Sequence, residues 1–316
     1  MSERPLEYRE LRWSDFPSYQ KLMLQAPGAF ERATGLDQTF DALFSYLHRR
    51  GLWTLLTLMR ALGQAPIRIF VGVDQGQVLG STSLVLLPKA GYIVAVVTDS
   101  ANRGRGIASH ILEQTHLATQ RKGRPWVALD VESDNETAIR VYRKLGYEER
   151  ARFNWHVGPT PAAIAHSAGI ATEVPRPKMK EVAAWMNLHQ PRALHDVLPA
   201  TAKMLSHHEN ITQLPTGTQA KTWSLSSSGL TTAVVRGFCL SMIKTVFVIP
   251  AGWDSTIPGD SLLSLVAPVV DWARSLGATR TVVVVPEPPG AWESAMISLG
   301  LPKAVSTLLM VRPSAP

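Results

Sequence analysis

The chain has 316 residues, of which 45% are hydrophobic and 18% are charged. This length is enough for two domains with complete cores, and the composition excludes a disordered or fibrous protein. The net charge of +7 does not indicate nucleic-acid binding. Residues 1–158 hold 20 Lys and Arg against 16 Asp and Glu, and the remainder holds 12 against 9, so the excess forms no basic patch.

The number of cysteines and the length of the apolar runs predict the cellular location of the protein. Cys239 is the single cysteine, so no internal disulfide can form. No signal peptide is visible at the start, and these two features predict a reducing, cytoplasmic location. No apolar run approaches the length that crosses a bilayer, so we expect no membrane partner.

The N-terminal region reads as one strand followed by helices. Residues 5–12 alternate as in a strand, and a helix is predicted over 16–24 with Ser14 or Asp15 as its N-cap. A further helix is predicted from Asp37 to Arg50. The almost wholly apolar stretch 52–62 is then either a buried helix or lid, or else a subunit contact or a grip on an apolar group.

The pattern then becomes β. Residues 68–73 and 78–87 read as strands around the turn Asp74–Gln77, which predicts a hairpin. A buried strand, Tyr92–Val97, follows and leads into a glycine-rich loop at 103–108. The next helix carries an apolar stripe made of Ile107, Ile111, Leu112, Thr115 and Ala118.

The glycine-rich loop predicts a phosphate-binding site. Gly104 and Gly106 allow a tight turn with successive N–H groups exposed, and the first N–H groups of a helix have no partner inside it. The helix dipole adds partial positive charge there, and Arg103 and Arg105 add more. The spacing fits neither a dinucleotide fingerprint nor a nucleoside triphosphate loop, because the third glycine and the Gly-Lys-Ser/Thr ending are missing.

A second motif follows at a fixed distance. After the apolar strand 126–131 come Asn135, Ala138, Tyr142 and Gly146-Tyr147, which fill the pattern Asn-x-x-Ala-x-x-x-Tyr-x-x-x-Gly-Tyr. The loop fits the pattern Arg-x-x-Gly-x-Ala. With both motifs in this order, the chain resembles the GNAT family of acetyltransferases, which take an acyl group from coenzyme A. The resemblance implies an α/β fold, a mixed sheet flanked by helices, and acetyl-CoA as the cofactor.

The resemblance also implies roles for particular residues. The loop is expected to bind the diphosphate of coenzyme A, and the backbone at the end of the preceding strand is expected to bind the pantetheine arm and the acyl oxygen. Asn135 is expected either to contact the cofactor or to cap the next helix, and Tyr142 either to protonate the leaving thiolate or to pack in the core. The cofactor-binding residues are then Val96, Val97, Thr98, Arg103, Gly104, Arg105, Gly106, Ile107, Ala108, Asn135 and Tyr142.

The general base is the part of the site that the sequence leaves open. Asp130 and Glu132 alternate with apolar residues, so they lie on one face of their strand and are candidates for the base. The alternative is that both are solvated or paired carboxylates without a catalytic role. Glu31 and Asp37 are further candidates. Residues 207–209, His-His-Glu, are adjacent on the chain and do not form a metal site without more ligands, so no metal is expected.

The second half repeats the hydrophobic pattern of the first. A shift of 154 positions lays residues 68–157 over 222–311 without a gap, which predicts two domains of one architecture. We expect a catalytic domain at 1–157, a linker at 158–168 and a degenerate copy at 169–316. In the copy, six positions that carry chemistry in the first half are changed. Ile257, Pro258, Asp260 and Leu262 stand at the loop positions, and Pro289 and Met296 replace Asn135 and Tyr142.

These observations predict a tandem-GNAT N-acetyltransferase that transfers acetyl from acetyl-CoA to a primary amine of a small molecule or a protein. A non-catalytic acyl-CoA sensor and an acyltransferase for a longer acyl group are the alternatives. The expected partner is a small-molecule amine. The expected assembly is a monomer, in which the two halves form a pseudo-dimer, or a homodimer.

Overall fold

The computed structural model describes residues 6–25, 28–37, 67–164, 171–190, 195, 197, 199–201, 218–227, 229–253 and 259–315. The chain divides into two compact units. Unit 1 consists of Met1–Gly28, Phe40–Arg150 and Leu308–Pro316, and unit 2 of Ala29–Thr39 and Ala151–Thr307. The units therefore do not follow the linear division expected at 157 and 169, since each takes a short segment from the other end of the chain.

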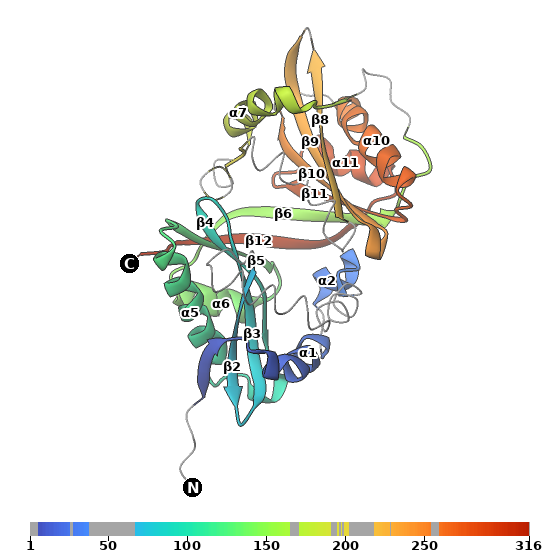
Figure 1. Cartoon of the computed structure of the whole chain (residues 1–316). Helices are drawn as coiled ribbons and strands as arrows, with labels where there is room; N and C mark the ends of the chain where they lie inside the picture. Colours follow the sequence, from blue (N-terminus) through green and yellow to red (C-terminus); the bar gives the residue numbers. More distant parts are fainter. Residues whose placement is uncertain are drawn as a thin grey trace. The chain divides into compact units, whose positions relative to one another are not determined.

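Unit 1 contains a mixed sheet in the order β1-β2-β3-β4-β5. Its strands are β1 (Glu7–Glu10), β2 (Ile67–Asp74), β3 (Gln77–Leu86), β4 (Ala90–Thr98) and β5 (Trp126–Glu132). Neighbouring strands are antiparallel except β4 and β5, which are parallel. Gln75 and Gly76 have φ of 47° and 81°, so β2 and β3 form the predicted hairpin (Figure 1).

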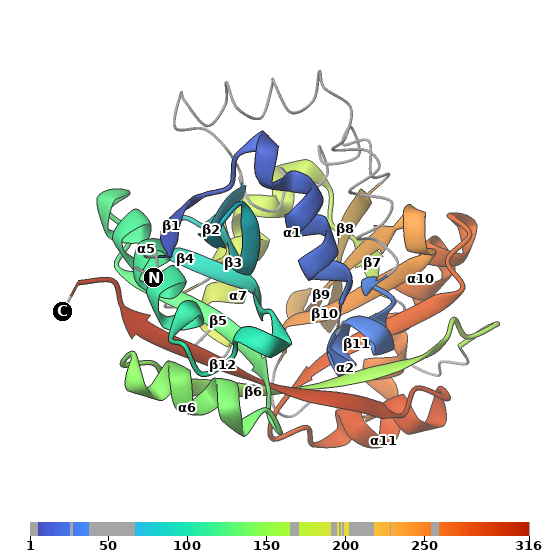
Figure 2. The same ribbon diagram turned by 90° about the horizontal axis from the view of Figure 1, so that it is seen from below.

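Helices cover both faces of this sheet. Figures 1 and 2 place α5 (Ile107–Arg121) and α1 (Phe16–Leu24) on opposite sides of the β2–β3 hairpin. The five residues of the predicted stripe on α5 are all buried, which confirms that stripe. On the α5 side the core includes residues of β4, β5 and α6 (Glu136–Lys144), and on the α1 side it includes Val71, Val73 and Val78.

Helix α1 begins where the sequence predicted, but the predicted capping hydrogen bond is absent. Asp15 is the N-cap residue, but its side chain makes no capping hydrogen bond. The carboxylate instead accepts from the backbone N–H of Arg12 at 2.7 Å and from the guanidinium of Arg9 at 3.0 Å. The residue therefore stabilises the short 3-10 helix η1 (Trp13–Asp15) that precedes α1.

The end of β12 (Lys303–Pro313) belongs to unit 1. Leu308 and Met310 are 2% and 0% exposed, and they pack in the same core as α5. Arg312 donates to the carbonyl oxygen of Leu145 at 2.6 Å and to Nδ1 of His116 at 3.2 Å. Residues that lie far apart in the chain therefore complete one core.

This buried histidine predicts a pH-dependent stability. Burial, with a smaller contribution from Arg312, lowers the pKa of His116 to about 3. Because Arg312 donates to Nδ1, the neutral ring carries its proton on Nε2 and donates to the Tyr147 hydroxyl at 2.7 Å. Above the unfolded pKa of about 6.5 neither state is protonated, and below it only the unfolded state gains the proton, so stability falls by up to about 1.4 kcal/mol per pH unit towards pH 3.

Urea unfolding at about pH 7 and pH 5 checks this expectation. His116→Gln should lose less stability on acidification than the parent, because Gln does not titrate. His110→Gln, an exposed position on the same helix, is the matched control and should behave as the parent. Equal pH dependence of the parent and His116→Gln would contradict the assignment.

Unit 2 repeats the element order of unit 1. Its sheet order is β6-β11-β10-β9-β8-β7. Shifting β4, α5, β5 and α6 by 154 positions places each within two residues of β10, α10, β11 and α11, which is the predicted repeat. The elements are β6 (Glu148–Pro159), β7 (Thr172–Glu173), η3 (Arg176–Lys178), α7 (Met179–His189), β8 (Thr218–Ser227), β9 (Leu230–Leu240), η5 (Ser241–Ile243), β10 (Thr245–Trp253), α10 (Gly259–Ser275), β11 (Arg280–Pro286) and α11 (Ala291–Ser298).

Three local features of the structure differ from what the sequence predicted. The strand pair expected over 147–157 is one strand, β6, which continues through Gly158 and Pro159 of the expected linker. A Cβ at Gly158 would lie 2.6 Å from the carbonyl oxygen of Gly300, so this glycine serves a close backbone contact and not a linker. The short helix α2 (Ala29–Thr34) was not predicted.

Other predictions fall on undescribed residues. The predicted helix beyond Asp37, the apolar stretch 52–62 and residues 207–209 all lie outside the described part of the chain.

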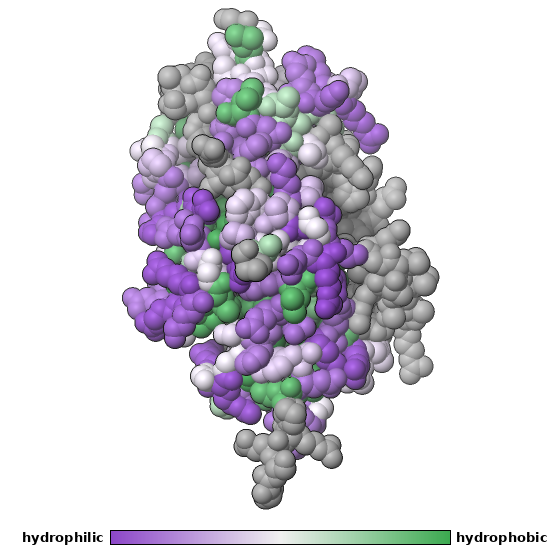
Figure 3. Space-filling model, turned by 90° about the vertical axis from the view of Figure 1, so that its left-hand side faces the viewer, coloured by the Kyte–Doolittle hydropathy of each residue, from purple (hydrophilic) through white to green (hydrophobic). Residues whose placement is uncertain are grey.

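Among the described residues, no helix combines the length and the apolar character that crossing a membrane requires. On the face in Figure 3, hydrophilic residues surround small, separate apolar spots. The most exposed large apolar residues, Leu188, Leu230 and Ile297, come from three different elements.

Candidate functional site

The central strand of unit 1 carries a β-bulge. Ser83 of β3 pairs with Val94, and Ser81 pairs with Val97, so β4 holds one extra residue between these pairs. Ala95, inside the bulge, has φ of 54°, which is unusual for a residue with a side chain. Bulges bend a strand and redirect its backbone groups, and they are frequent beside active sites.

The bulge coincides with the end of strand pairing. The parallel pairs of β4 and β5 run from Ala90–Trp126 to Ile93–Leu129 and stop there. Both strands continue, β4 to Thr98 and β5 to Glu132. The backbone of β4 from Val94 onward therefore has no β5 partner on this edge, and its polar groups are available to a ligand. Val96, Val97 and Thr98, predicted to bind the cofactor, lie in this segment.

The predicted phosphate loop joins β4 to α5 through the short helix η2 (Ser100–Asn102). Gly104 and Gly106 have φ of 79° and 76°, and Gly106 is the N-cap of α5. Residues 103–106 are exposed, and in the described structure the N–H groups from Gly104 to Ala108 donate to no protein acceptor. The loop therefore presents free backbone N–H groups at the N-terminus of α5, which is the arrangement that binds an anion.

Side chains around the loop hold it in place, and sequence reasoning had not identified them. Asn102 accepts from Arg105 at 2.6 Å and donates to the Asp99 carboxylate at 2.7 Å. Nδ1 of His110 donates to the carbonyl oxygen of Gly106 at 2.9 Å, and its ring stacks on Tyr8 at 4.9 Å. The position of His110, four residues after Gly106, was the available sequence signal.

Asn135 is the N-cap of α6 and accepts from the backbone N–H of Ala138 at 3.1 Å. Its capping role, one of the two alternatives, is therefore present. The residue is exposed, and the cap uses only its oxygen, so the amide nitrogen can still donate to a ligand.

Tyr142 lies on α6 with its ring in the core of unit 1. It is 5% exposed and packs edge-on against Tyr147 with ring centroids 5.9 Å apart. Its hydroxyl makes no hydrogen bond within the described part of the chain and is not among the fully buried, unsatisfied atoms. Burial raises its pKa to about 12, so the phenol keeps its proton at neutral pH. Packing and proton donation are both compatible with this placement.

The two base candidates differ in their surroundings. Asp130 follows directly after the last β4–β5 pair and accepts a hydrogen bond from the Tyr92 hydroxyl. The surrounding protein raises the pKa of Asp130 to about 7, although the residue itself keeps contact with solvent. A hydroxyl donor such as that of Tyr92 favours the charged form of a carboxylate. Glu132 lies two residues further along β5 and is half-buried.

The equivalent positions of unit 2 lack these groups. Strand β10 also carries a bulge, next to Pro250 and Gly252. Met296, which stands where unit 1 has Tyr142, is fully buried and apolar, and the N-cap of α11 is Gly290, which makes no side-chain cap hydrogen bond. Ile257 and Pro258 lie outside the described residues.

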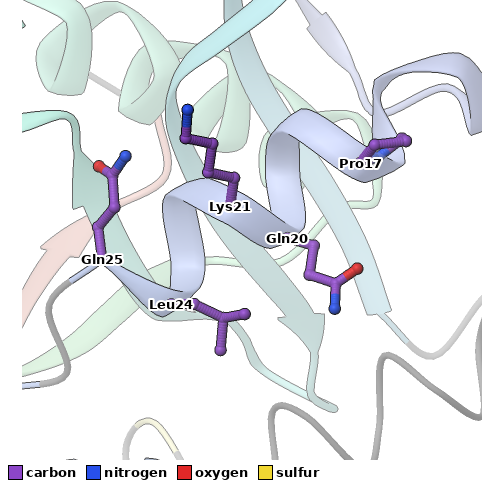
Figure 4. A pocket seen from close by; sticks show the side chains of 5 residues that line it. All are labelled: Pro17, Gln20, Lys21, Leu24 and Gln25. Carbon is purple, nitrogen blue, oxygen red and sulfur yellow. The ribbon is translucent and has the colours of Figure 1, made fainter.

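A surface pocket in the described structure lies elsewhere, along α1 (Figure 4). Its lining consists of Pro17, Gln20, Lys21, Leu24 and Gln25, all from this helix and the residue that ends it. One helix cannot enclose a ligand, and none of the predicted site residues is present. We therefore place the candidate site at β4, β5 and the loop, which hold the unpaired backbone of β4, the exposed N–H groups of the loop and the Asp130 carboxylate.

The segment that holds these residues is similar to known proteins. Residues 29–147 match the Acetyltransferase (GNAT) family. A mycothiol acetyltransferase of Mycobacterium sp. (strain JLS) is 30% identical over 118 residues, which cover 34% of this chain and 39% of that relative. The enzyme of the same name from Mycolicibacterium smegmatis is 41% identical over 58 residues, or 18% of this chain and 20% of the relative. The matched segment thus spans about two fifths or less of these relatives.

Solved structures resemble the whole chain. A GCN5-related N-acetyltransferase from Sphaerobacter thermophilus has 14% identity and a TM-score of 0.66, with 98% of this chain and 96% of that chain covered. A tandem GNAT protein from the clavulanic acid biosynthesis pathway has 13% identity and a TM-score of 0.62, with 99% of both chains covered. These similarities show the fold, and the family match covers the segment with both motifs. Residues 29–147 therefore carry a match to the GNAT family, and the whole chain shares its fold with a tandem GNAT protein.

Proposed function

We propose that unit 1 transfers an acetyl group from acetyl-CoA to a primary amine. The observation that carries the proposal is the bulge in β4, which frees backbone donors beside a phosphate loop with unpartnered N–H groups. GNAT proteins generally use acetyl-CoA, and the mycothiol acetyltransferase relatives are named for acetyl transfer.

The residues fit the chemistry of this cofactor. The free N–H groups from Gly104 to Ala108, with Arg103 and Arg105, would bind the diphosphate. The unpaired backbone of Val96, Val97 and Thr98 would bind the pantetheine amides and donate to the acyl oxygen, where negative charge develops during attack. Asn135 would donate its amide, and Tyr142 would supply a proton to the leaving thiolate. Bound acetyl-CoA supplies an activated thioester.

The acceptor proposed is the amine of a small molecule, in line with the name of the relatives. The sequence of unit 2 has Pro258, Pro289 and Met296 where unit 1 has Gly104, Asn135 and Tyr142, so we assign it no acyl transfer of its own. We propose that the chain acts as a monomer or a homodimer and in a reducing compartment, as its single cysteine predicts.

Thiol release from acetyl-CoA with a panel of small amines tests the proposal. We expect turnover above the rate of hydrolysis with at least one amine. Tight binding of coenzyme A with no turnover across the panel would identify a sensor instead. Faster release from longer acyl-CoA thioesters than from acetyl-CoA would identify a different acyl donor.

Gly104→Ala is expected to weaken coenzyme A binding by roughly tenfold or more. A side chain at φ of 79° is strained, so the loop would relax and its N–H groups would turn away from the diphosphate. Gly76→Ala, at φ of 81° in the β2–β3 turn, carries the same strain away from the site and is the matched control. Neither Cβ would meet an atom within 4 Å, so both variants should fold.

Calorimetric titration with coenzyme A measures the difference between these variants. Equal affinities for Gly104→Ala, Gly76→Ala and the parent would remove the loop from the binding site.

A further inference from the structure

The face of the β4–β5 pair opposite α5 carries an interaction that neither motif includes. Ile93 and Leu129 pack in the core beneath α5. Side chains alternate along a strand, so Tyr92 and Asp130 lie on the other face. Tyr92 pairs with Ala128, which makes Asp130 its diagonal neighbour, and its phenol reaches across to donate to that carboxylate.

This interaction lies at the point where the two strands separate. Asp130 is the first residue of β5 beyond the last parallel pair, and Val94, the last residue of β4 before the bulge, is 37% exposed on the same face as Tyr92. The carboxylate therefore lies at the start of the unpaired segment of β4, whose later residues Val96, Val97 and Thr98 the proposed function assigns to the pantetheine arm and the acyl oxygen. An exposed carboxylate there is open to an incoming amine.

We infer that Asp130 is the general base of the proposed acetyl transfer and that Tyr92 positions it. The inference rests on the proposed function. The amine nitrogen forms a bond to the acetyl carbon as the carbon–sulfur bond breaks. The proton leaving the nitrogen goes to the Asp130 carboxylate, and the thiolate receives the proton of the Tyr142 hydroxyl.

The charges around Asp130 support this role. Desolvation is the cause of its raised pKa, and no charged group of the described residues contributes. On the helix covering this side of the sheet, Lys21 is the basic residue, and it is exposed. Arg312 is engaged with Leu145 and His116, and Glu132 is the other carboxylate of this face. A general base works best with a pKa near the operating pH, and the raised pKa of Asp130 moves it in that direction.

The pH dependence of kcat/KM tests the inference, with the most active amine of the panel as acceptor and full-length protein. Asp130→Asn should lower kcat/KM by about 100-fold or more and remove the acidic ionisation from the profile. Tyr92→Phe should move this ionisation to higher pH, because the carboxylate loses the donor that favours its charged form. A purely structural tyrosine would not shift the profile. Asp74→Asn, at the end of β2, is the matched control, and its pH profile should superimpose on that of the parent.

The outcomes separate the two proposals. If the parent turns over and the pH profiles of kcat/KM are unchanged in Asp130→Asn and Tyr92→Phe, the inference is wrong and the proposed function stands. The same holds if Glu132→Gln removes the acidic ionisation from the profile. Absence of thiol release with the parent would overturn the proposed function and this inference with it. If Asp130→Asn does not fold, Asp130→Glu replaces it in the test. This variant keeps an ionisable carboxylate on a longer side chain, so its pH profile must retain the acidic limb while kcat falls.

Discussion

Deleting residues 308–316 is expected to leave unit 1 unable to fold. The segment supplies Leu308 and Met310 to the core beneath α5, and Arg312 donates to Leu145 and His116. Each buried Leu or Met truncated to Ala costs about 2–5 kcal/mol. Loss of both side chains together with the arginine is comparable with the entire stability of a domain, about 5–15 kcal/mol.

Single substitutions test how much individual side chains of this strand contribute to the free energy of unfolding. Met310→Ala should lower the free energy of unfolding by about 2–5 kcal/mol. Lys303→Ala, on the exposed start of the same strand, should change it by less than about 0.5 kcal/mol. Urea unfolding followed by circular dichroism measures both variants. A deletion variant with the parent's unfolding midpoint would show that residues 308–316 do not belong to the core of unit 1.

Tyr142→Phe is expected to lower kcat by on the order of 100-fold, with little change in coenzyme A affinity. The substitution removes only a hydroxyl that makes no hydrogen bond in the described structure, so the core beneath α5 stays intact. The effect should shrink towards alkaline pH, since a thiol with a pKa near about 8.5 then leaves as the thiolate without a proton. Steady-state kinetics against pH measure both features.

Tyr147→Phe is the matched control for this experiment. The two rings touch, but the Tyr147 hydroxyl accepts from His116 at 2.7 Å and so contributes to stability. We expect this variant to lower the free energy of unfolding by about 1 kcal/mol and to leave kcat near that of the parent. An unchanged kcat in Tyr142→Phe would assign Tyr142 to packing, the alternative that the sequence left open.

The candidate site was predictable where its parts are local in sequence. Glycines, arginines and the stripe of α5 are read from neighbouring residues, because turn geometry and the 3.6-residue period depend on nothing else. The interaction of Tyr92 with Asp130 was not predictable in this way. Its residues lie on different strands, and only the register of β4 against β5 makes them neighbours.

The bulge in β4 is a similar case. Its φ of 54° falls on Ala95 and not on a glycine, so no residue type marks it. Such a conformation persists because the pairing of β4 with β3 on both sides fixes it.

The sequence by itself determined the order of elements, the shared architecture of the two halves and the glycine-rich loop at 103–108 that resembles the GNAT motif. These follow from hydrophobic periodicity and a constant offset of 154 positions, which are properties of the chain alone. Only the tertiary structure decided which segments share a core. Residues 29–39 join unit 2, where the ring of Phe30 packs edge-on against Trp155, and residues 308–316 join unit 1, where Leu308 and Met310 are buried. Apolar side chains are buried wherever a complementary face is open, whatever their distance along the chain.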